Sequence, residues 1–284
     1  MKLQTGVHTL LLSARDLSLF KIGASLTAEL KALPLVRAHR LRNYERSFAF
    51  AEGCFLGVFR SFEDASLCAP PGKSLGFDRA EYAKKYRERL ESVYAYDYPI
   101  LYWLSQVLTN ESTLFDLGGH IGIHFVTFKR YLEDRFPALW TICDVLEVVE
   151  AGRRLAIAES AKGLEFTTTI AHAANADVLF SAGAIQYIES PSFLESLAAL
   201  DRRPPHVLLN KVPVHDRESF VTLQNIGTGF APLHCFKREA FVSAFSDLGY
   251  ELVDSWKNPE YHCQIPFHPE FSVSYLSGFY FRSA

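Results

Sequence analysis

A glycine-rich turn after a short apolar run constrains the fold of this chain more than any other feature. Residues Ser112–Phe115 predict a buried strand, and the next residues, Asp116–Gly122, read Asp-Leu-Gly-Gly-His-Ile-Gly. Apolar residues then recur at helical spacing over Ile123–Tyr131. Gly118 and Gly122 allow backbone angles closed to other residues, and the free N–H groups of a new helix favour negative charge. The pattern predicts a cradle for an anionic or zwitterionic ligand, with a tight turn that binds nothing as the alternative.

Three further apolar runs follow, separated by segments long enough to hold helices: Trp140–Asp144, Asp177–Ser181 and His206–Asn210. Alternating strands and helices predict an α/β fold with a parallel sheet, whose ligand lies beyond the carboxyl ends of the strands. The polar residues expected at those ends are Asp116, Asp144, Ser181 and Asn210. A carboxylate closing the second strand can accept both hydroxyl hydrogens of a ribose.

These pieces together resemble a class I S-adenosylmethionine-dependent methyltransferase, and more narrowly a bacterial methyltransferase family. The family pattern is Asp-x-Gly-Gly-x-x-Gly, then Trp-x-x-x-acid with Val-x-x-Gly-Arg/Lys, then Ser-x-x-x-x-Gln-Tyr. The matching segments here are Asp116–Gly122, Trp140–Asp144 with Val149–Arg153, and Ser181–Tyr187. With Gly57–Ala65, which resembles the entry segment of that family, the likeness covers residues 55 to 282. It implies a Rossmann-like sheet, mostly parallel with an antiparallel last strand, and an N-terminal helical segment.

The resemblance also implies the cofactor, S-adenosyl-L-methionine, and the residues that bind it. The expected cofactor-binding residues are Asp116, Gly118, Gly119, Gly122, Asp144, Ser181 and Gly183. His120 departs from the general pattern, which has a glycine there, so the methionine end of the cofactor is expected to be held differently.

Three residues are the catalytic candidates. Where one branch of O-methyltransferases has a histidine base, this chain has Gln186 and Tyr187. Gln186 cannot take a proton, so it is expected to orient a substrate hydroxyl while Tyr187 walls the pocket, with strand-end packing as the alternative for both. His215 is the best-placed base, because Lys211–His215 extends the carboxyl end of a strand into the expected substrate loop. His120, His124, His172 and His234 are weaker candidates, since a lone histidine is more often structural.

Composition narrows the partners. The net charge is −3 and the sequence pI about 6.4, so the protein has no overall positive potential that would favour binding to nucleic acid. Five widely spaced cysteines without a Cys-x-x-Cys pair indicate reduced thiols in a cytoplasmic protein. No apolar stretch approaches the roughly 18 residues of a membrane span. The loop with His262, Cys263 and His268 falls short of a closed metal site, so no metal is expected.

The organisation predicted along the chain is an N-terminal helical or cap segment, 1–110, and a cofactor-binding domain, 111–284. Residues 1–52 are expected to be mostly helical. Ala240–Gly249 is expected to form a helix, Tyr250–Asp254 a strand and Ser272–Phe281 a β-rich C-terminal segment. This ending favours methyl transfer over hydride transfer, because nicotinamide-type reductases usually end in parallel strands.

The expected function is therefore methyl transfer to a small molecule or carrier-bound intermediate, at oxygen. Two alternatives remain: a nicotinamide-dependent enzyme of similar fold, and a binding protein that kept the fold and lost the chemistry. The acceptor and the oligomeric state, a homodimer included, stay open at this point.

Overall fold

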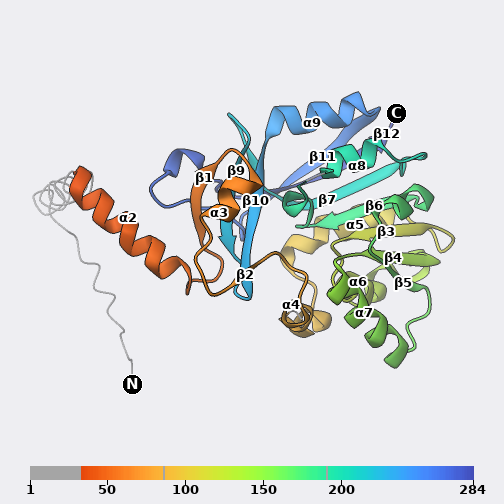
Figure 1. Ribbon diagram of the computed structural model, residues 1–284. Helices are drawn as coiled ribbons and strands as arrows, with labels where there is room; N and C mark the ends of the chain where they lie inside the picture. Colours follow the sequence, from red (N-terminus) through yellow and green to blue (C-terminus); the bar gives the residue numbers. More distant parts are fainter. Residues whose placement is uncertain (1–32, 86, 190) are drawn as a thin grey trace, which may run out of the picture. The chain divides into compact units, whose positions relative to one another are not determined.

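A computed structural model describes residues 33–85, 87–189 and 191–284 (Figure 1). The chain divides into two compact units, residues 1–47 and residues 48–284. Helix α2 (Pro34–Phe48) falls within the stretch expected to be helical, whereas residues 1–32 lie outside the described residues. No helix among the described residues has the length and apolar character needed to cross a membrane.

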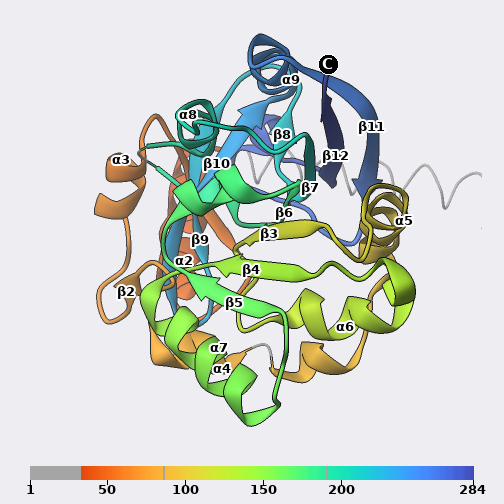
Figure 2. The same cartoon turned by 90° about the vertical axis from the view of Figure 1, so that its right-hand side faces the viewer.

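Within residues 48–284, seven strands form the larger sheet, in the order β11-β12-β7-β6-β3-β4-β5 (Figure 2). Their bounds are β3 (Thr113–Leu117), β4 (Leu139–Cys143), β5 (Leu164–Thr167), β6 (Val178–Ala182), β7 (His206–Val212), β11 (Tyr250–Asn258) and β12 (Leu276–Ser283). Neighbouring strands from β5 to β7 run parallel, and β12 is antiparallel to both β7 and β11. The predicted Rossmann-like sheet with an antiparallel last strand is confirmed.

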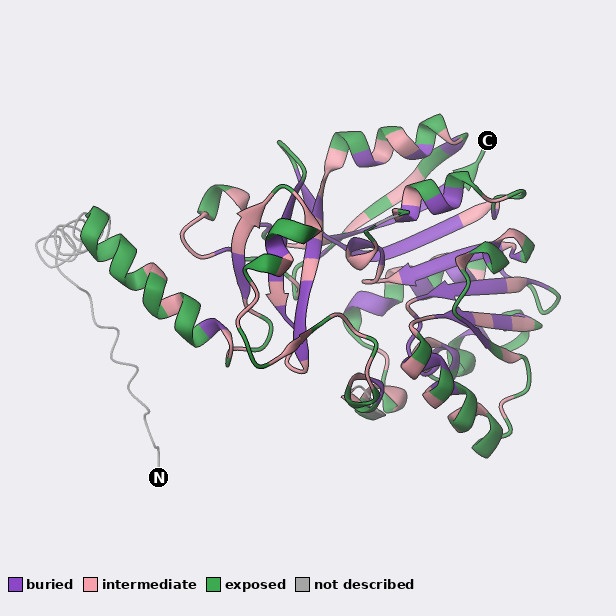
Figure 3. Ribbon diagram, viewed as in Figure 1, coloured by how far each residue is buried: buried purple, intermediate pink, exposed green. Residues whose placement is uncertain are grey.

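Both faces of this sheet are covered, which is why its central strands read as continuous apolar runs. Successive residues point to opposite faces: Leu114 packs in one buried cluster and Phe115 in the other. The Leu114 cluster takes in residues from α5 (Tyr98–Val107), α6 (Ile123–Leu132) and α7 (Leu146–Ala158). Figure 3 shows the resulting burial of the central strands.

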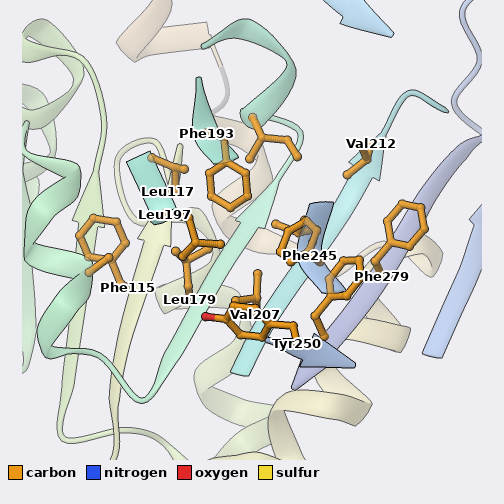
Figure 4. Close-up of a cluster of buried hydrophobic side chains, with 14 of the residues drawn as sticks. Phe115, Leu117, Leu179, Phe193, Leu197, Val207, Val212, Phe245, Tyr250 and Phe279 are labelled. Atoms are coloured by element: carbon orange, nitrogen blue, oxygen red, sulfur yellow. The ribbon is translucent and has the colours of Figure 1, made fainter. Parts of the chain in front are cut away.

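The opposite face carries α8 (Phe193–Ala198) and α9 (Arg238–Asp247). Figure 4 shows Phe193 from α8 and Phe245 from α9 meeting Leu179, Val207 and Phe279 of the strands. These side chains are almost fully buried, and each buried large apolar side chain contributes roughly 1.5 to 3 kcal/mol. The sheet edge that carries the expected site is therefore rigidly supported from both sides.

A second, smaller sheet was not predicted. It consists of β1 (Phe55–Phe59), β2 (Ser74–Leu75), β9 (Phe220–Asn225) and β10 (Gly229–Lys237), in the order β1-β9-β10-β2, with β8 (Val214–His215) pairing to β10. Helix α3 (Phe62–Leu67) packs against it, and α4 (Ala80–Lys85) follows β2. Strands that precede residue 110 thus pair with strands that follow residue 212.

Element boundaries differ from the sequence predictions mainly near the C terminus. The expected strand at residues 250–254 continues to Asn258, because β11 pairs with β12 along its full length. The expected β-rich segment at 272–281 begins later, at Leu276, after a 3₁₀ turn at Pro269–Phe271. Helix α9 confirms the helix expected at 240–249.

Candidate active site

A cavity of about 500 Å³ lies at the carboxyl ends of β3, β4, β6 and β7. This volume is within the range of small-molecule sites, roughly 300 to 1,000 Å³. Residues from the glycine turn, the end of β4, the segment after β6 and the end of β7 line it, together with aromatic side chains from residues 77–96. The cavity therefore lies at the edge of the sheet where the sequence placed the ligand.

The glycine turn forms one wall, and its shape requires glycine. Gly118 has a left-handed backbone with φ of +76°, and a Cβ there would lie 2.2 Å from the Ala184 Cβ. A Cβ on Gly119 would lie 2.5 Å from Asp116 Oδ2. Gly118 and Gly119 both line the cavity. Gly122 does not; its φ of +100° begins helix α6 instead.

Asp116 lies beneath the turn and is completely buried. Its Oδ2 accepts a hydrogen bond from Trp140 Nε1 at 3.2 Å and lies 3.7 Å from His124 Nδ1. Its Oδ1 has no hydrogen-bond partner among the described residues. Because an unsatisfied buried polar atom costs about 1 to 3 kcal/mol, this oxygen marks a place where a donor is expected.

Asp144 follows β4 and lines the cavity. Its Oδ2 accepts from the His120 backbone N–H at 2.9 Å and its Oδ1 from the Val145 N–H at 2.8 Å. Burial raises the pKa of this carboxyl to about 6, against the lowering effect of these two hydrogen bonds. An ionised carboxylate has about four acceptor positions, so each Asp144 oxygen keeps capacity for a ligand donor.

His120 occupies a left-handed conformation, with φ of 57°, where the general family pattern has glycine. Its Nε2 lies 3.1 Å from the Tyr82 carbonyl oxygen, and the two rings meet edge to face. Burial lowers the pKa of His120 to about 4, so the imidazole is neutral at pH 7. His120 therefore joins the turn to α4 as an uncharged part of the wall.

Of the two cofactor-binding residues expected at the end of β6, one supports the sheet and the other lines the cavity. Ser181 is buried and donates from Oγ to the Leu117 carbonyl at 2.8 Å, so it ties β6 to β3 and does not line the cavity. Gly183, with φ of +86°, does line it.

The two residues after β6 that were candidate catalytic groups also divide. Tyr187 lines the cavity, and its hydroxyl lies 2.5 Å from Gln224 Oε1 in β9. Gln186 is buried behind the wall, with Nε2 at 3.4 Å from the Lys211 carbonyl oxygen. The structure therefore brings Tyr187, but not Gln186, to the cavity surface.

His215 lies away from the cavity, in β8 at the edge of the second sheet. Its Nε2 is 3.0 Å from the Glu270 carbonyl oxygen, and its Nδ1 is 3.3 Å from the Glu218 backbone nitrogen. With the proton on Nε2, the ring donates to Glu270 and accepts from the Glu218 N–H. Both ring nitrogens are thus engaged by backbone, and no geometry brings His215 to the other candidates.

Sequence reasoning missed Lys211, the penultimate residue of β7. Its side chain lines the cavity, and its Nζ lies 5.0 Å from the Tyr96 ring centroid and 5.5 Å from that of Tyr261. Burial lowers the pKa of Lys211 to about 8. The available indication was a lysine near the end of a mostly apolar run, at the strand end where ligands bind.

No family model matches the sequence, and no curated protein matches it. Solved structures do. The structure of 1,6-didemethyltoxoflavin-N1-methyltransferase from Burkholderia thailandensis, with bound 1,6-didemethyltoxoflavin and S-adenosylhomocysteine, is 15% identical, with TM-score 0.49 over 72% of this chain and 87% of that chain. Magnesium protoporphyrin IX methyltransferase from Synechocystis, with bound SAM, is 12% identical, with TM-score 0.48 over 73% and 93%. A SAM-dependent methyltransferase from Aquifex aeolicus is 14% identical, with TM-score 0.46 over 72% and 99%.

At these identities and TM-scores, the fold is assigned from the sheet itself. A strand order of β5-β4-β3-β6-β7-β12-β11, with only β12 reversed and a glycine turn after β3, defines a Rossmann-like fold of the class I methyltransferase type.

Proposed function

We propose that this protein is an S-adenosylmethionine-dependent methyltransferase that acts on a small molecule or carrier-bound intermediate, at oxygen. The observation that carries the proposal is the meeting of the Gly118–Gly119 turn and Asp144 in one cavity, at the ends of the adjacent strands β3 and β4. A backbone that cannot tolerate a Cβ stands next to the half-buried Asp144 carboxylate, which can accept two more hydrogen bonds.

The chemical groups of the cofactor match the residues present. Its ribose carries two hydroxyl donors, which suit the Asp144 carboxylate. Its amino-acid arm is zwitterionic, which suits the backbone of the turn and the start of α6. The Asp116 Oδ1 atom lacks a donor among the described residues and lies under the same turn, so it offers a hydrogen-bond acceptor where an ammonium group is expected. Beyond Asp144, the cavity is lined by Val145 and Ile170, apolar surfaces suited to a base.

When bound, the cofactor supplies an electrophilic methyl group, so the protein mainly has to align the acceptor and exclude water. Alignment of two reactants can lower a barrier by roughly 7 to 11 kcal/mol. Side chains of Tyr94, Tyr96 and Tyr187 line the cavity and can hold a flat acceptor by ring contact. A cavity of about 500 Å³ with aromatic side chains in its wall supports a small acceptor or the end of a carrier-bound one.

The test is direct titration of the purified protein with S-adenosylhomocysteine and, separately, with NADH, by calorimetry. We expect S-adenosylhomocysteine to bind at one site per chain and NADH not to bind. Asp144→Ala is expected to weaken this binding at least tenfold, because a hydrogen bond to a charged group contributes about 1.5 to 3 kcal/mol.

Asp177→Ala is the matched control, since Asp177 lies at the other end of the sheet, just before β6, and bonds to Thr113. It should leave the affinity within twofold. Tighter binding of NADH, or unchanged binding by Asp144→Ala, would contradict the proposal. The acceptor is then sought by incubating cell extract with labelled S-adenosylmethionine and identifying metabolites that gain the label.

A further inference from the structure

Lys211 enters the cavity through a bulge in β7. In the pairing of β7 with β12, Leu209 lies opposite Phe279 and Val212 opposite Ser277, so Asn210 and Lys211 together face the single residue Gly278. Lys211 has φ of 56°, a left-handed backbone inside a strand. A strained conformation of this kind persists only where its surroundings fix it, and such residues cluster at functional sites.

Asn210 fixes the bulge from both ends of its side chain. Its Nδ2 donates to the Tyr96 carbonyl at 2.8 Å. Its Oδ1 accepts from Trp256 Nε1 at 3.1 Å, from Asn258 Nδ2 at 2.7 Å and from the Lys211 N–H at 3.1 Å. Two elements, the 3₁₀ turn Ala95–Asp97 and strand β11, are thereby tied to the bulge. The position of Lys211 is therefore specified by packing and not by chance.

The ammonium group is buried without a matched anion. Lys211 is 9% exposed, and no described residue forms a hydrogen bond or ion pair with its Nζ, which faces the rings of Tyr96 and Tyr261. The charged groups that act on it are Asp97 and Asp116, which favour its charge, and Arg89, which opposes it. A lysine buried for structure alone is normally paired with a carboxylate, so this one is expected to meet a ligand group in the cavity.

Lys211 stands at the far end of the cavity from Asp144. Strands β3 and β6 separate β4 from β7, and three strand spacings amount to about 14 Å. The Lys211 side chain packs beside Gly183, where a Cβ would lie 3.6 Å from its Cβ and Cε atoms. It is thus out of reach of the proposed ribose site and close to the place left for the acceptor.

We propose that Lys211 is a catalytic residue that binds the acidic hydroxyl of the acceptor, a phenol or enol, and takes its proton as the methyl group is transferred. The proposal deepens and rests on the proposed function. In the step, the acceptor O–H bond breaks and its proton passes to Lys211 Nζ. The acceptor oxygen bonds to the methyl carbon, and the bond between that carbon and sulfur breaks with its electron pair left on sulfur. One positive charge thus moves from sulfonium to ammonium.

The setting suits both forms of the amine. A sulfonium nearby disfavours a second cation, so cofactor binding favours the neutral amine that can accept a proton. After transfer the sulfonium charge is gone, and the faces of Tyr96 and Tyr261 stabilise the ammonium that has formed. Release of the proton through the cavity mouth resets the site.

Acidity decides the class of acceptor. With the pKa of Lys211 lowered to about 8 by burial, proton transfer from a phenol with a pKa near 10 is unfavourable by only about 10²-fold. Transfer from a hydroxyl about as acidic as water, with a pKa near 16, is unfavourable by about 10⁸-fold. The aromatic lining also favours a flat acceptor. The structure therefore favours phenols and enols over aliphatic alcohols.

The binding test uses 4-nitrophenol, whose phenolate absorbs visible light, with a panel of hydroxybenzoates and naphthols, on protein saturated with S-adenosylhomocysteine. We expect wild type to raise the ionised fraction of the bound phenol and Lys211→Met to lose at least tenfold in phenolate affinity. Lys257→Met is the matched control, because Lys257 lies 4.5 Å from the Tyr275 ring centroid and does not line the cavity. It should behave as wild type.

Turnover separates proton transfer from simple attraction. On a phenol that wild type methylates, kcat should rise with pH and level off by about pH 8, the pKa of Lys211 without cofactor, because the bound sulfonium lowers that pKa further. Lys211→Arg keeps the positive charge but cannot act as a base, so it should keep phenolate affinity and lose at least 10²-fold in kcat. Lys211→Arg with wild-type kcat, or Lys211→Met with wild-type affinity, overturns the proposal, as does a wild-type protein that binds S-adenosylhomocysteine but none of the panel. Failure of S-adenosylhomocysteine itself to bind refutes the proposed function instead.

Discussion

Asp144 gives the sharpest prediction, because its titration falls within an accessible pH range. Burial raises the pKa of its carboxyl to about 6 in the absence of ligand. If ribose hydroxyls donate to this carboxylate, the cofactor prefers the ionised form, and its binding lowers the pKa. Above pH 6 the group is already ionised and affinity is constant, whereas below pH 6 each ligand must first displace a proton from a growing fraction of the protein.

The expected size of the effect follows from the hydrogen bonds. A charged hydrogen bond contributes about 1.5 to 3 kcal/mol, which equals a lowering of the carboxyl pKa by about 1 to 2 units. With a pKa of about 6 in the free protein and about 4 to 5 in the complex, the affinity for S-adenosylhomocysteine should therefore fall about seven- to twentyfold between pH 7 and about pH 4.5. His120, whose pKa burial lowers to about 4, stays neutral over most of this range and adds little.

Calorimetric titrations of wild type and Asp144→Asn at half-unit pH steps measure this directly. The amide keeps the shape of the side chain but has no titrating charge, so the variant should bind weakly at pH 7 and show no such fall at lower pH. A wild-type affinity that stays constant from pH 7 to pH 5, beside an equally tight Asp144→Asn, would refute the assignment of the ribose to Asp144. Unfolding curves at each pH check that the protein remains folded.

Three further predictions concern stability. Gly118→Ala should lower the free energy of unfolding by about 3 kcal/mol, since a left-handed alanine costs about 1 to 2 kcal/mol and the contact with Ala184 adds a clash. Gly249→Ala, at φ of +83° with open space around it, should cost only the backbone part. Equal shifts in Tm for the two variants would argue against a closely packed turn. In urea unfolding at pH 7, Lys211→Met should be about 3 kcal/mol more stable than wild type, because burial lowers the pKa of Lys211 from 10.5 in the unfolded chain to about 8 in the folded protein. This difference in stability should disappear between about pH 8 and 10.5, where only the unfolded wild-type chain keeps the lysine proton. A difference that does not change with pH would contradict the prediction. Trp140→Phe should lower the free energy of unfolding in urea by at least 1 to 3 kcal/mol, because the buried Asp116 carboxyl loses its hydrogen bond from the indole N–H. An unchanged unfolding midpoint would show that this hydrogen bond contributes nothing to stability.

The sequence was informative where structure is local. The strand, glycine turn and helix around Asp116 follow from an apolar run, the glycines after it and the helical spacing of the next apolar residues. Asp144 follows from a second apolar run that ends in an acid. Both residues lie at the same edge of the sheet because strand ends in a parallel sheet share an edge, and Asp144 lines the cavity there. Ser181 was placed on the right strand, but which side of a buried strand faces a ligand depends on its neighbours, and its hydroxyl bonds to Leu117.

His215 shows the limit of the same reasoning. The expected substrate loop after β7 is instead the short strand β8, paired with Phe236 and Lys237 of β10. That pairing joins residues about twenty positions apart through the edge of a sheet that periodicity did not reveal. Once the loop is used as a strand, the His215 ring is held by the Glu218 backbone N–H and the Glu270 carbonyl, and it does not line the cavity.

The proposed acceptor end of the cavity is therefore built from contacts that no single motif contains. Lys211 reaches it because β7 bulges opposite Gly278, where a Cβ would lie 2.0 Å from the Trp256 ring, and because Asn210 binds that same indole. Contacts among three segments far apart in the chain, in β7, β11 and β12, are therefore needed for Lys211 to point into the site. Local rules fix the proposed cofactor end of the cavity, and long-range packing fixes the proposed acceptor end. Substitution at the bulge should thus change acceptor preference while leaving cofactor affinity intact, a separation that the calorimetric and phenolate assays can measure on the same protein.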